Sequence, residues 1–332
     1  MEKRKVTKAK WITTSLLCAS IIIGALAILF ALFFNPQRTF TITETFRITS
    51  ARGSETYLSV ALPMSGGYQA IYNLLVEGGA EYWLEYFNGW RNLTVRIPSE
   101  DLETVVAISF TARLFRNAQP WEGTMLAEYT LPQQFIDSDN EDIIALARAL
   151  RGDKDFQTAE NVVNYVYRFI SWPPPGSKTG YRLAASELLE YPIGVCGDFA
   201  NLTTALLRAE GIPARNISGL VLDVNRLAFR STNDWGHLGG AHGWVEFFAD
   251  GKWHFADPSW GWFNRNATAH LSFGTYDMYI RSDFQQNLME QLVPDGFYLR
   301  GGMSAPLRFL LYSTDADAMV IPRGDVHFSW FR

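Results

Sequence analysis

The sequence is poor in cysteine, with 2 residues among 332. Cys18 lies in an apolar run near the N-terminus, so the remainder of the chain holds Cys196 alone and can form no disulfide within itself. No group of cysteines and histidines has the spacing of a zinc site, and His237 with His242 would make a poor pair of metal ligands. The sequence therefore predicts no metal site and no cofactor.

A basic excess is also missing, because 29 lysines and arginines stand against 34 acidic residues, a net charge of −5. This balance excludes the broad basic footprint of a nucleic-acid-binding protein. The charge is uneven, however: residues 1–34 carry +4, from five basic residues and Glu2, which leaves −9 for the rest. The pattern is that of an acidic body attached to a basic N-terminal tip.

Charge is absent altogether from residues 11–34, which are mostly Ile, Leu, Ala and Phe. A helix of this length, at about 1.5 Å per residue, crosses a hydrocarbon core of about 30 Å. The basic residues precede the run, which predicts that residues 1–10 are cytoplasmic and the body extracytoplasmic. A cleaved signal peptide is the alternative, but the run is long for one and no small-x-small cleavage site follows. We expect an uncleaved, single-pass membrane anchor.

Residues 38–132 have the pattern of β structure. Apolar residues roughly alternate with polar ones after Phe40, and Asn88-Gly89 separates two strand-like runs, 81–87 and 90–97. Asn-Gly is a strong hairpin signal, because both turn residues adopt positive φ. Several short strands at this spacing predict a β-sandwich-like domain. No cluster of catalytic residues occurs here, so we expect a structural or partner-binding role.

Helical periodicity replaces the β pattern in residues 137–172. Ser138 and Glu141 have the spacing of a capping box, and apolar residues then recur at helical spacing up to Ile170. A shorter helix is expected over 183–190. Another run follows Cys196, and Gly211 and Pro213 end it. Cys196 should therefore lie at a helix N-terminus, where the helix dipole and free N–H groups favour the nucleophilic thiolate.

Strand patterns return after Pro213, and Asp250-Gly251 gives a second hairpin signal. If the loop is symmetric about this dipeptide, residues that face each other have numbers that sum to 501, and Asp257 faces Trp244. His242 then lies on the same face as Asp257, close enough for their side chains to meet. A one-residue bulge would place them on opposite faces. An aspartate beside an imidazole fixes its tautomer and stabilises the imidazolium. His254 and His270 are interpreted as structural.

These blocks, in this order, resemble the transglutaminase-like superfamily of papain-fold cysteine enzymes over about residues 137–280, and the type resembled is the membrane-anchored prokaryotic one. The matching residues are Gly194-Val195-Cys196-Gly197, Gly211-Ile212-Pro213-Ala214-Arg215, His242-Gly243-Trp244-Val245-Glu246, Gly251-Lys252-Trp253 and Asp257-Pro258-Ser259-Trp260-Gly261. The resemblance implies an α+β fold, with helices packed on an antiparallel sheet over residues 133–280. It places a β-sandwich-like domain (38–132) before this core and a C-terminal extension (281–332) after it, packed on the core or on the β domain. Ser259 departs from the family pattern, in which Thr is commoner.

The resemblance also implies a catalytic triad of Cys196, His242 and Asp257 that attacks an amide or ester carbonyl. The backbone N–H of Cys196, with Tyr181 or Trp172, is expected to stabilise the oxyanion. Trp235, in the long polar loop 225–241, and Trp244 are candidate substrate contacts. The expected function is hydrolysis or acyl transfer on a protein or peptide substrate. The alternative is a non-catalytic, membrane-tethered adhesion or assembly module with the same fold.

Overall fold

The computed structural model describes residues 20–24, 37–87, 90–120, 127–174, 183–222, 241–275, 297–303 and 308–329. The chain divides into two compact units, Met1–Gln37 and Arg38–Arg332. In the first unit, residues 20–24 are helical and exposed. No helix among the residues described is both long and apolar enough to cross a membrane. Most of the anchor predicted over 11–34, and the tip at 1–10, lie outside the described residues.

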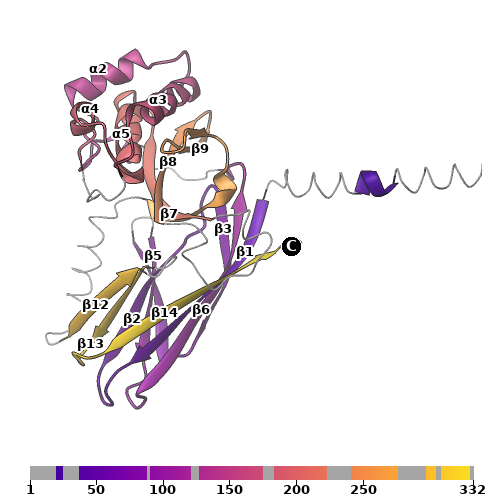
Figure 1. The fold of residues 1–332 in the computed structure, drawn as a ribbon, viewed down its shortest axis with the longest axis vertical. Coiled ribbons are helices and arrows are strands. Elements are labelled where there is room, and N and C mark those ends of the chain that lie inside the picture. Colours follow the sequence, from indigo (N-terminus) through magenta and orange to yellow (C-terminus); the bar gives the residue numbers. More distant parts are fainter. Residues whose placement is uncertain are drawn as a thin grey trace, which may run out of the picture. The chain divides into compact units, whose positions relative to one another are not determined.

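Two antiparallel sheets form a β-sandwich in the second unit (Figure 1). One sheet has the order β14 (Met319–Ser329), β1 (Gln37–Thr49), β6 (Glu103–Phe115), β3 (Gln69–Glu77). The other has the order β12 (Tyr298–Met303), β13 (Arg308–Ser313), β2 (Thr56–Leu62), β5 (Trp90–Ile97), β4 (Glu81–Phe87). The hairpin predicted from Asn88-Gly89 is confirmed: β4 pairs with β5 up to Phe87 and Trp90, although the two turn residues lie outside the described ranges.

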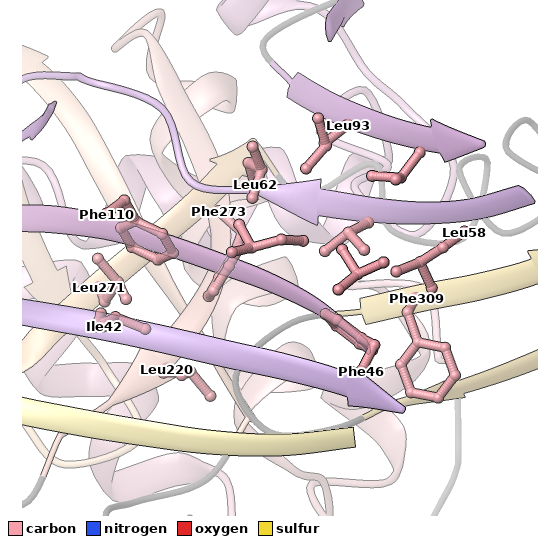
Figure 2. Packing of buried hydrophobic residues seen from close by; sticks show 14 of the residues in the cluster. Ile42, Phe46, Leu58, Leu62, Leu93, Phe110, Leu220, Leu271, Phe273 and Phe309 are labelled. Carbon is pink, nitrogen blue, oxygen red and sulfur yellow. The ribbon is translucent and has the colours of Figure 1, made fainter. Parts of the chain in front are cut away.

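The sandwich core follows from the alternation in its strands. Phe40, Ile42 and Phe46 on β1 are fully buried and meet the inward-facing residues of the opposite sheet, including Leu58 and Phe309. Figure 2 shows this packing and one further feature of it: side chains from outside the sandwich enter the same cluster. These are Leu220, Leu222, Leu271 and Phe273, which come from the third sheet or directly follow one of its strands.

The C-terminal strands complete the sandwich and do not form a separate layer. β14 pairs with β1 along its whole length, from Thr39 opposite Ser329 to Thr49 opposite Met319. β13 pairs with β2, and β12 pairs with β13. β14 therefore forms one edge of the sandwich, and the segment between β6 and β12 is an insertion between strands of the sandwich.

That insertion holds the third sheet and the helices that cover it (Figure 1). The sheet has the order β10 (Trp262–Phe263), β9 (Lys252–Asp257), β8 (Ala241–Ala249), β7 (Ala214–Val221), β11 (His270–Thr275), and all its pairs are antiparallel. The helices are α2 (Glu141–Ala149), α3 (Asp155–Phe169), α4 (Glu187–Glu190), α5 (Cys196–Ala209) and the short 3-10 turns η1 (Ala127–Thr130) and η3 (Ala267–Ala269). The expected α+β core with helices on an antiparallel sheet is confirmed.

Two helix boundaries differ from the sequence expectation. α2 begins at Glu141 and is capped by Asn140, whose Oδ1 accepts the N–H groups of Asp142 and Ile143 at 2.9 and 3.3 Å. The capping box predicted at Ser138 is therefore wrong, because asparagine caps a helix as well as serine and stands closer to the apolar run. The helix expected over 183–190 is shorter, spanning Glu187–Glu190.

The third sheet is joined to the sandwich by polar contacts as well as by the shared core. The side chain of Gln69, on β3, donates to the Ser272 carbonyl at 2.7 Å and accepts the Ser272 N–H at 2.8 Å. The Gln69 amide thus bonds both the N–H and the C=O of Ser272, as the backbone of a neighbouring strand would. β7 approaches β11 closely at Gly219, where an added Cβ would lie 2.0 Å from the Leu271 carbonyl oxygen.

Candidate active site

Cys196 is the first residue of α5, as the sequence predicts. The residue before it, Val195, offers no side-chain cap, but the Asp198 carboxylate reaches back and accepts the Val195 N–H at 2.8 Å. This is half of a capping box, and it fixes the turn that presents the sulfur. Residues 197–208 of the helix are all buried, so α5 is a rigid central support for its first residue.

The β8–β9 hairpin brings His242 and Asp257 together. The strand pairs from Val245 opposite Ala256 to Ala249 opposite Lys252 all have numbers that sum to 501, and the turn residues Asp250 and Gly251 have φ of 50° and 77°. No bulge interrupts the register. The prediction that His242 and Asp257 share a face is therefore confirmed, and His242 Nε2 lies 2.8 Å from Asp257 Oδ2.

Asp257 is fully buried and accepts from four groups. His242 Nε2 and His270 Nε2 lie 2.8 and 3.3 Å from Oδ2. The Ser259 N–H and hydroxyl donate to Oδ1 at 3.0 and 2.7 Å. Burial alone would raise the pKa of Asp257, but these donors, first His242 and then His270, hold it well below its usual range. The carboxylate is therefore ionised and fixed in direction.

His242 connects this carboxylate to the thiol. Its ring is buried, which by itself would lower its pKa. The hydrogen bond to Asp257, the hydrogen bond to Cys196 and the charges of both partners outweigh this and raise the pKa of His242 to about 9. Because Nε2 is used by Asp257, Nδ1 is the ring nitrogen left for the sulfur. The imidazole therefore remains protonated at neutral pH, between a carboxylate and a thiol.

Sulfur, imidazole and carboxylate thus lie in the order that the sequence predicts. The family model described as the transglutaminase-like superfamily matches residues 144–258, which include all three residues. Residues 144–258 form a transglutaminase-like superfamily domain. The likeness extends to a curated protein of Mycobacterium leprae, "Uncharacterized protein ML0607", which is 34% identical over 85 residues; the match covers 26% of this chain and 28% of that protein.

Two solved structures match much of this chain. One is a "putative cysteine protease" from Cytophaga hutchinsonii, 15% identical with a TM-score of 0.50, in a match that covers 88% of this chain and 98% of that one. A second is the periplasmic domain of TgpA from Pseudomonas aeruginosa, 17% identical with a TM-score of 0.36, over 64% of this chain and 75% of that one. At these identities the first likeness establishes the fold alone.

His270 also reaches the site, and it lies beyond the range matched by the family model. It is the first residue of β11, and its Nδ1 lies 3.1 Å from the Asn266 carbonyl while Nε2 faces Asp257. Burial lowers the pKa of His270, and a neutral ring has one N–H to share between these two acceptors. His270, interpreted from the sequence as structural, therefore lies against Asp257, and His254, which lies 3.1 Å from the Ala249 carbonyl, fits a structural role.

The ligand atoms of His242, Asp257 and His270 lie within 4.8 Å of one another, a separation that a metal ion could bridge. The same nitrogens and oxygen are already joined by hydrogen bonds of 2.8 and 3.3 Å. A cation would have to displace both bonds and the imidazolium proton. The donor set is therefore better described as a proton-carrying chain within the transglutaminase-like domain.

The aromatic candidates fall in different places. Tyr181 and Trp235 lie outside the described residues. Trp172 is half-exposed beside the site and packs on Phe199 of α5, with ring centroids 5.6 Å apart. Trp244, the other candidate substrate contact, is 2% exposed and lies beside His242, with ring centroids 6.4 Å apart. The exposed ring that stacks on the His242 imidazole belongs to Trp260, with centroids 4.7 Å apart and planes at 17°.

Proposed function

We propose that this protein is a cysteine enzyme that breaks or transfers an amide acyl group of a peptide or protein through a thioester on Cys196. The observation that supports this most directly is the hydrogen-bonded chain from Asp257 through His242 to Cys196. A carboxylate, an imidazole and a thiol in that order supply an orienting group, a proton carrier and a nucleophile.

In the first half-reaction Cys196 attacks the carbonyl carbon as a thiolate paired with the protonated His242, and a C–S bond forms. The carbonyl oxygen becomes an oxyanion, for which the backbone N–H of Cys196, at the positive end of α5, is the available donor. The His242 imidazolium gives its proton to the leaving amine as the C–N bond breaks. The products are a free amine and an acyl thioester, with Asp257 holding the now neutral ring.

In the second half-reaction His242 takes a proton from the incoming nucleophile, which attacks the thioester carbon. The C–S bond breaks, the sulfur leaves as thiolate and the ring is again protonated. With water as nucleophile the product is an acid, and with an amine it is a new amide. Part of the raised pKa of His242 comes from its hydrogen bond to Cys196 and from the charge of that group, and this part is lost when the sulfur becomes a thioester, which favours the neutral ring that accepts the proton.

We further propose that the enzyme acts outside the cytoplasm, anchored through residues 11–34. This rests on the uncharged run and on the basic residues before it. To test this, a tag is placed after residue 332 and protease is added to intact spheroplasts. We expect the protease to digest the tag, and complete protection of the tag would contradict the proposed orientation.

The chemistry can be tested with an activated acyl donor, p-nitrophenyl acetate, on the full-length chain. We expect a burst of p-nitrophenolate equal in amount to the enzyme, with the acetyl group found on Cys196 by mass spectrometry. Cys196→Ala should show no burst, and His242→Asn should slow acylation by about 10²–10⁴-fold. His254→Asn, the same change at a buried histidine outside the site, is the matched control and should retain the burst.

Slow acylation of Cys196 that His242→Asn leaves unchanged would overturn the proposal, and the fold would then be a scaffold without catalysis. If acylation is fast, adding a primary amine and measuring the ratio of amide to acid products determines which second nucleophile the enzyme uses.

A further inference from the structure

An open cleft of about 590 Å³ lies beside the triad. Its size is in the range of small-molecule and side-chain binding sites. Six of the residues that line it are aromatic or aliphatic: Tyr167 and Ile170 at the end of α3, Trp172, Phe199, Trp260 and Trp262. Ser259 is the polar exception, and its hydroxyl already donates to Asp257.

The cleft is continuous with the catalytic groups. Ser259 Oγ lies 3.5 Å from His242 Nε2, and the Trp260 ring stacks on His242. Phe199 is in the first turn of α5, three positions after Cys196. A peptide whose carbonyl carbon reaches the sulfur would therefore place a neighbouring side chain in the cleft.

The surface of the cleft is apolar and uncovered. Tyr167 and Trp172 are each 48% exposed and Trp260 is 36% exposed. Single exposed aromatic residues are common, but several around one hollow mark a binding surface. None of the described residues that line this cleft is charged, so a charged group that entered it would lose hydration without gaining a counter-ion from them.

We infer that this cleft binds a large apolar side chain, aromatic or long aliphatic, next to the reacting amide of the acyl-donor peptide. The inference rests on the proposed function, because the cleft has this meaning only if Cys196 attacks a peptide. Full burial of such a side chain is worth about 1.5–3 kcal/mol, which corresponds to roughly 10–100-fold in rate constant.

The experiment measures the second-order rate constant for alkylation of Cys196 in the full-length chain by peptide chloromethyl ketones. The sulfur displaces chloride, so one C–S bond forms for each C–Cl bond broken. Two series of tripeptide probes are used. In one the chloromethyl ketone replaces the C-terminal carboxylate, and in the other it replaces the side-chain amide of a glutamine. In each series, every position that does not carry the electrophile is varied in turn to Phe, Leu, Ala, Lys or Asp. Iodoacetamide, which has no such side chain, provides the reference rate in every variant.

We expect Phe and Leu at one position to react about 10–100-fold faster than Ala, and Lys and Asp to react no faster than Ala. Tyr167→Lys should lower the Phe-to-Asp ratio at that position by about 10-fold or more, and Tyr167→Glu should lower the Phe-to-Lys ratio similarly. Tyr82→Lys is the matched control, because this tyrosine is 51% exposed and lies on β4 of the sandwich. It should leave every ratio unchanged.

Trp172 needs a separate pair of variants because the sequence also makes it an oxyanion donor candidate. Trp172→Phe removes the N–H but keeps an aromatic wall, so it should preserve the preference for Phe over Ala. Trp172→Ala removes both and should reduce that preference.

The failures of the two proposals can be distinguished. Rates that do not depend on His242 would overturn the proposed function. Fast, His242-dependent rates with no apolar preference at any position, or with a preference that neither Tyr167 variant alters, would leave the enzyme proposal standing and overturn the assignment of the cleft.

Discussion

Two buried charged groups lie on the same face of the third sheet, and only one of them is equipped for chemistry. β7 and β8 pair Arg215 with Glu246 and Gly219 with His242, and the row between them is Ile217 with Trp244. The first group is an ion pair in which Arg215 Nε and Nη2 both donate to Glu246 Oε2, at 3.0 and 2.7 Å. The second is the Asp257 chain described above.

The two groups differ in what surrounds them. Arg215 is enclosed by aromatic rings, with its guanidinium carbon 4.0 Å from the Trp253 ring centroid and 5.5 Å from that of Tyr129. Its charge is balanced by Glu246, and the Tyr129 side chain also interacts with it. Asp257 is linked through a titratable ring to a thiol. Burial of charge alone therefore does not identify a candidate catalytic site; the connection to a nucleophile does.

The largest expected effect is that of Asp257→Asn. It should lower the rate of Cys196 acylation by about 10³–10⁴-fold, since the amide no longer fixes the imidazole tautomer or stabilises its charge. In the wild type, activity should fall as pH rises through about 9, where His242 loses its proton. In the variant the burial of His242 is no longer offset by Asp257, so this alkaline limb should move to lower pH. A pH–rate profile with an unmoved limb would show that Asp257 does not set the proton affinity of His242.

Glu246→Leu should have the opposite consequences to Asp257→Asn: it should lower the stability of the fold and leave the pH dependence of Cys196 acylation unchanged. Removing one partner of a buried ion pair leaves the other charge without compensation and costs about 3–5 kcal/mol in free energy of unfolding. Urea denaturation measures the loss. The double variant Arg215→Met/Glu246→Leu should regain most of it, because no buried charge remains. A shifted alkaline limb in the double variant would mean that the two groups on this face are coupled.

His270→Phe is expected to give the smallest effect, a loss of about 10-fold in acylation rate, the equivalent of one hydrogen bond to a charged group. With one donor fewer on Oδ2, Asp257 should bind the His242 proton more tightly and move the alkaline limb to higher pH, opposite to Asp257→Asn. His270→Gln keeps an N–H donor and should restore part of the rate. If the alkaline limb of the pH–rate profile stays at its wild-type position in both variants, His270 contributes to packing only and does not influence the proton affinity of His242.

Much of the site could be predicted from the sequence because its signals are local. Asp250-Gly251 determines a two-residue turn, and the turn determines the register that joins His242 to Asp257. The thiol position followed in the same way from Gly194 and from the apolar spacing after Cys196. Each prediction needed only neighbours within one hairpin or one helix.

The rest depends on contacts between distant segments. His270 reaches Asp257 because β11 lies at the edge of the sheet beside β7, and no local pattern determines that strand order. For the same reason the sequence does not determine how exposed Trp244 and Trp260 are. Trp244 lies in β8 and Trp260 in the turn after β9, and packing against distant segments buries the first and leaves the second exposed. Ser259 was noted in the sequence only as a departure from a family pattern, although its hydroxyl holds the second oxygen of Asp257.

The pairing of β1 with β14 makes the order of synthesis important for this protein. When a ribosome has translated as far as residue 275, every residue of the proposed triad has been made, yet the sandwich still lacks three of its described strands. The apolar side chains of Leu220, Leu271 and Phe273, which pack into that sandwich, would then face water. We therefore expect the thiol to become firmly supported only after residue 329 has been added, which delays the appearance of a reactive sulfur until the newly made chain is nearly finished.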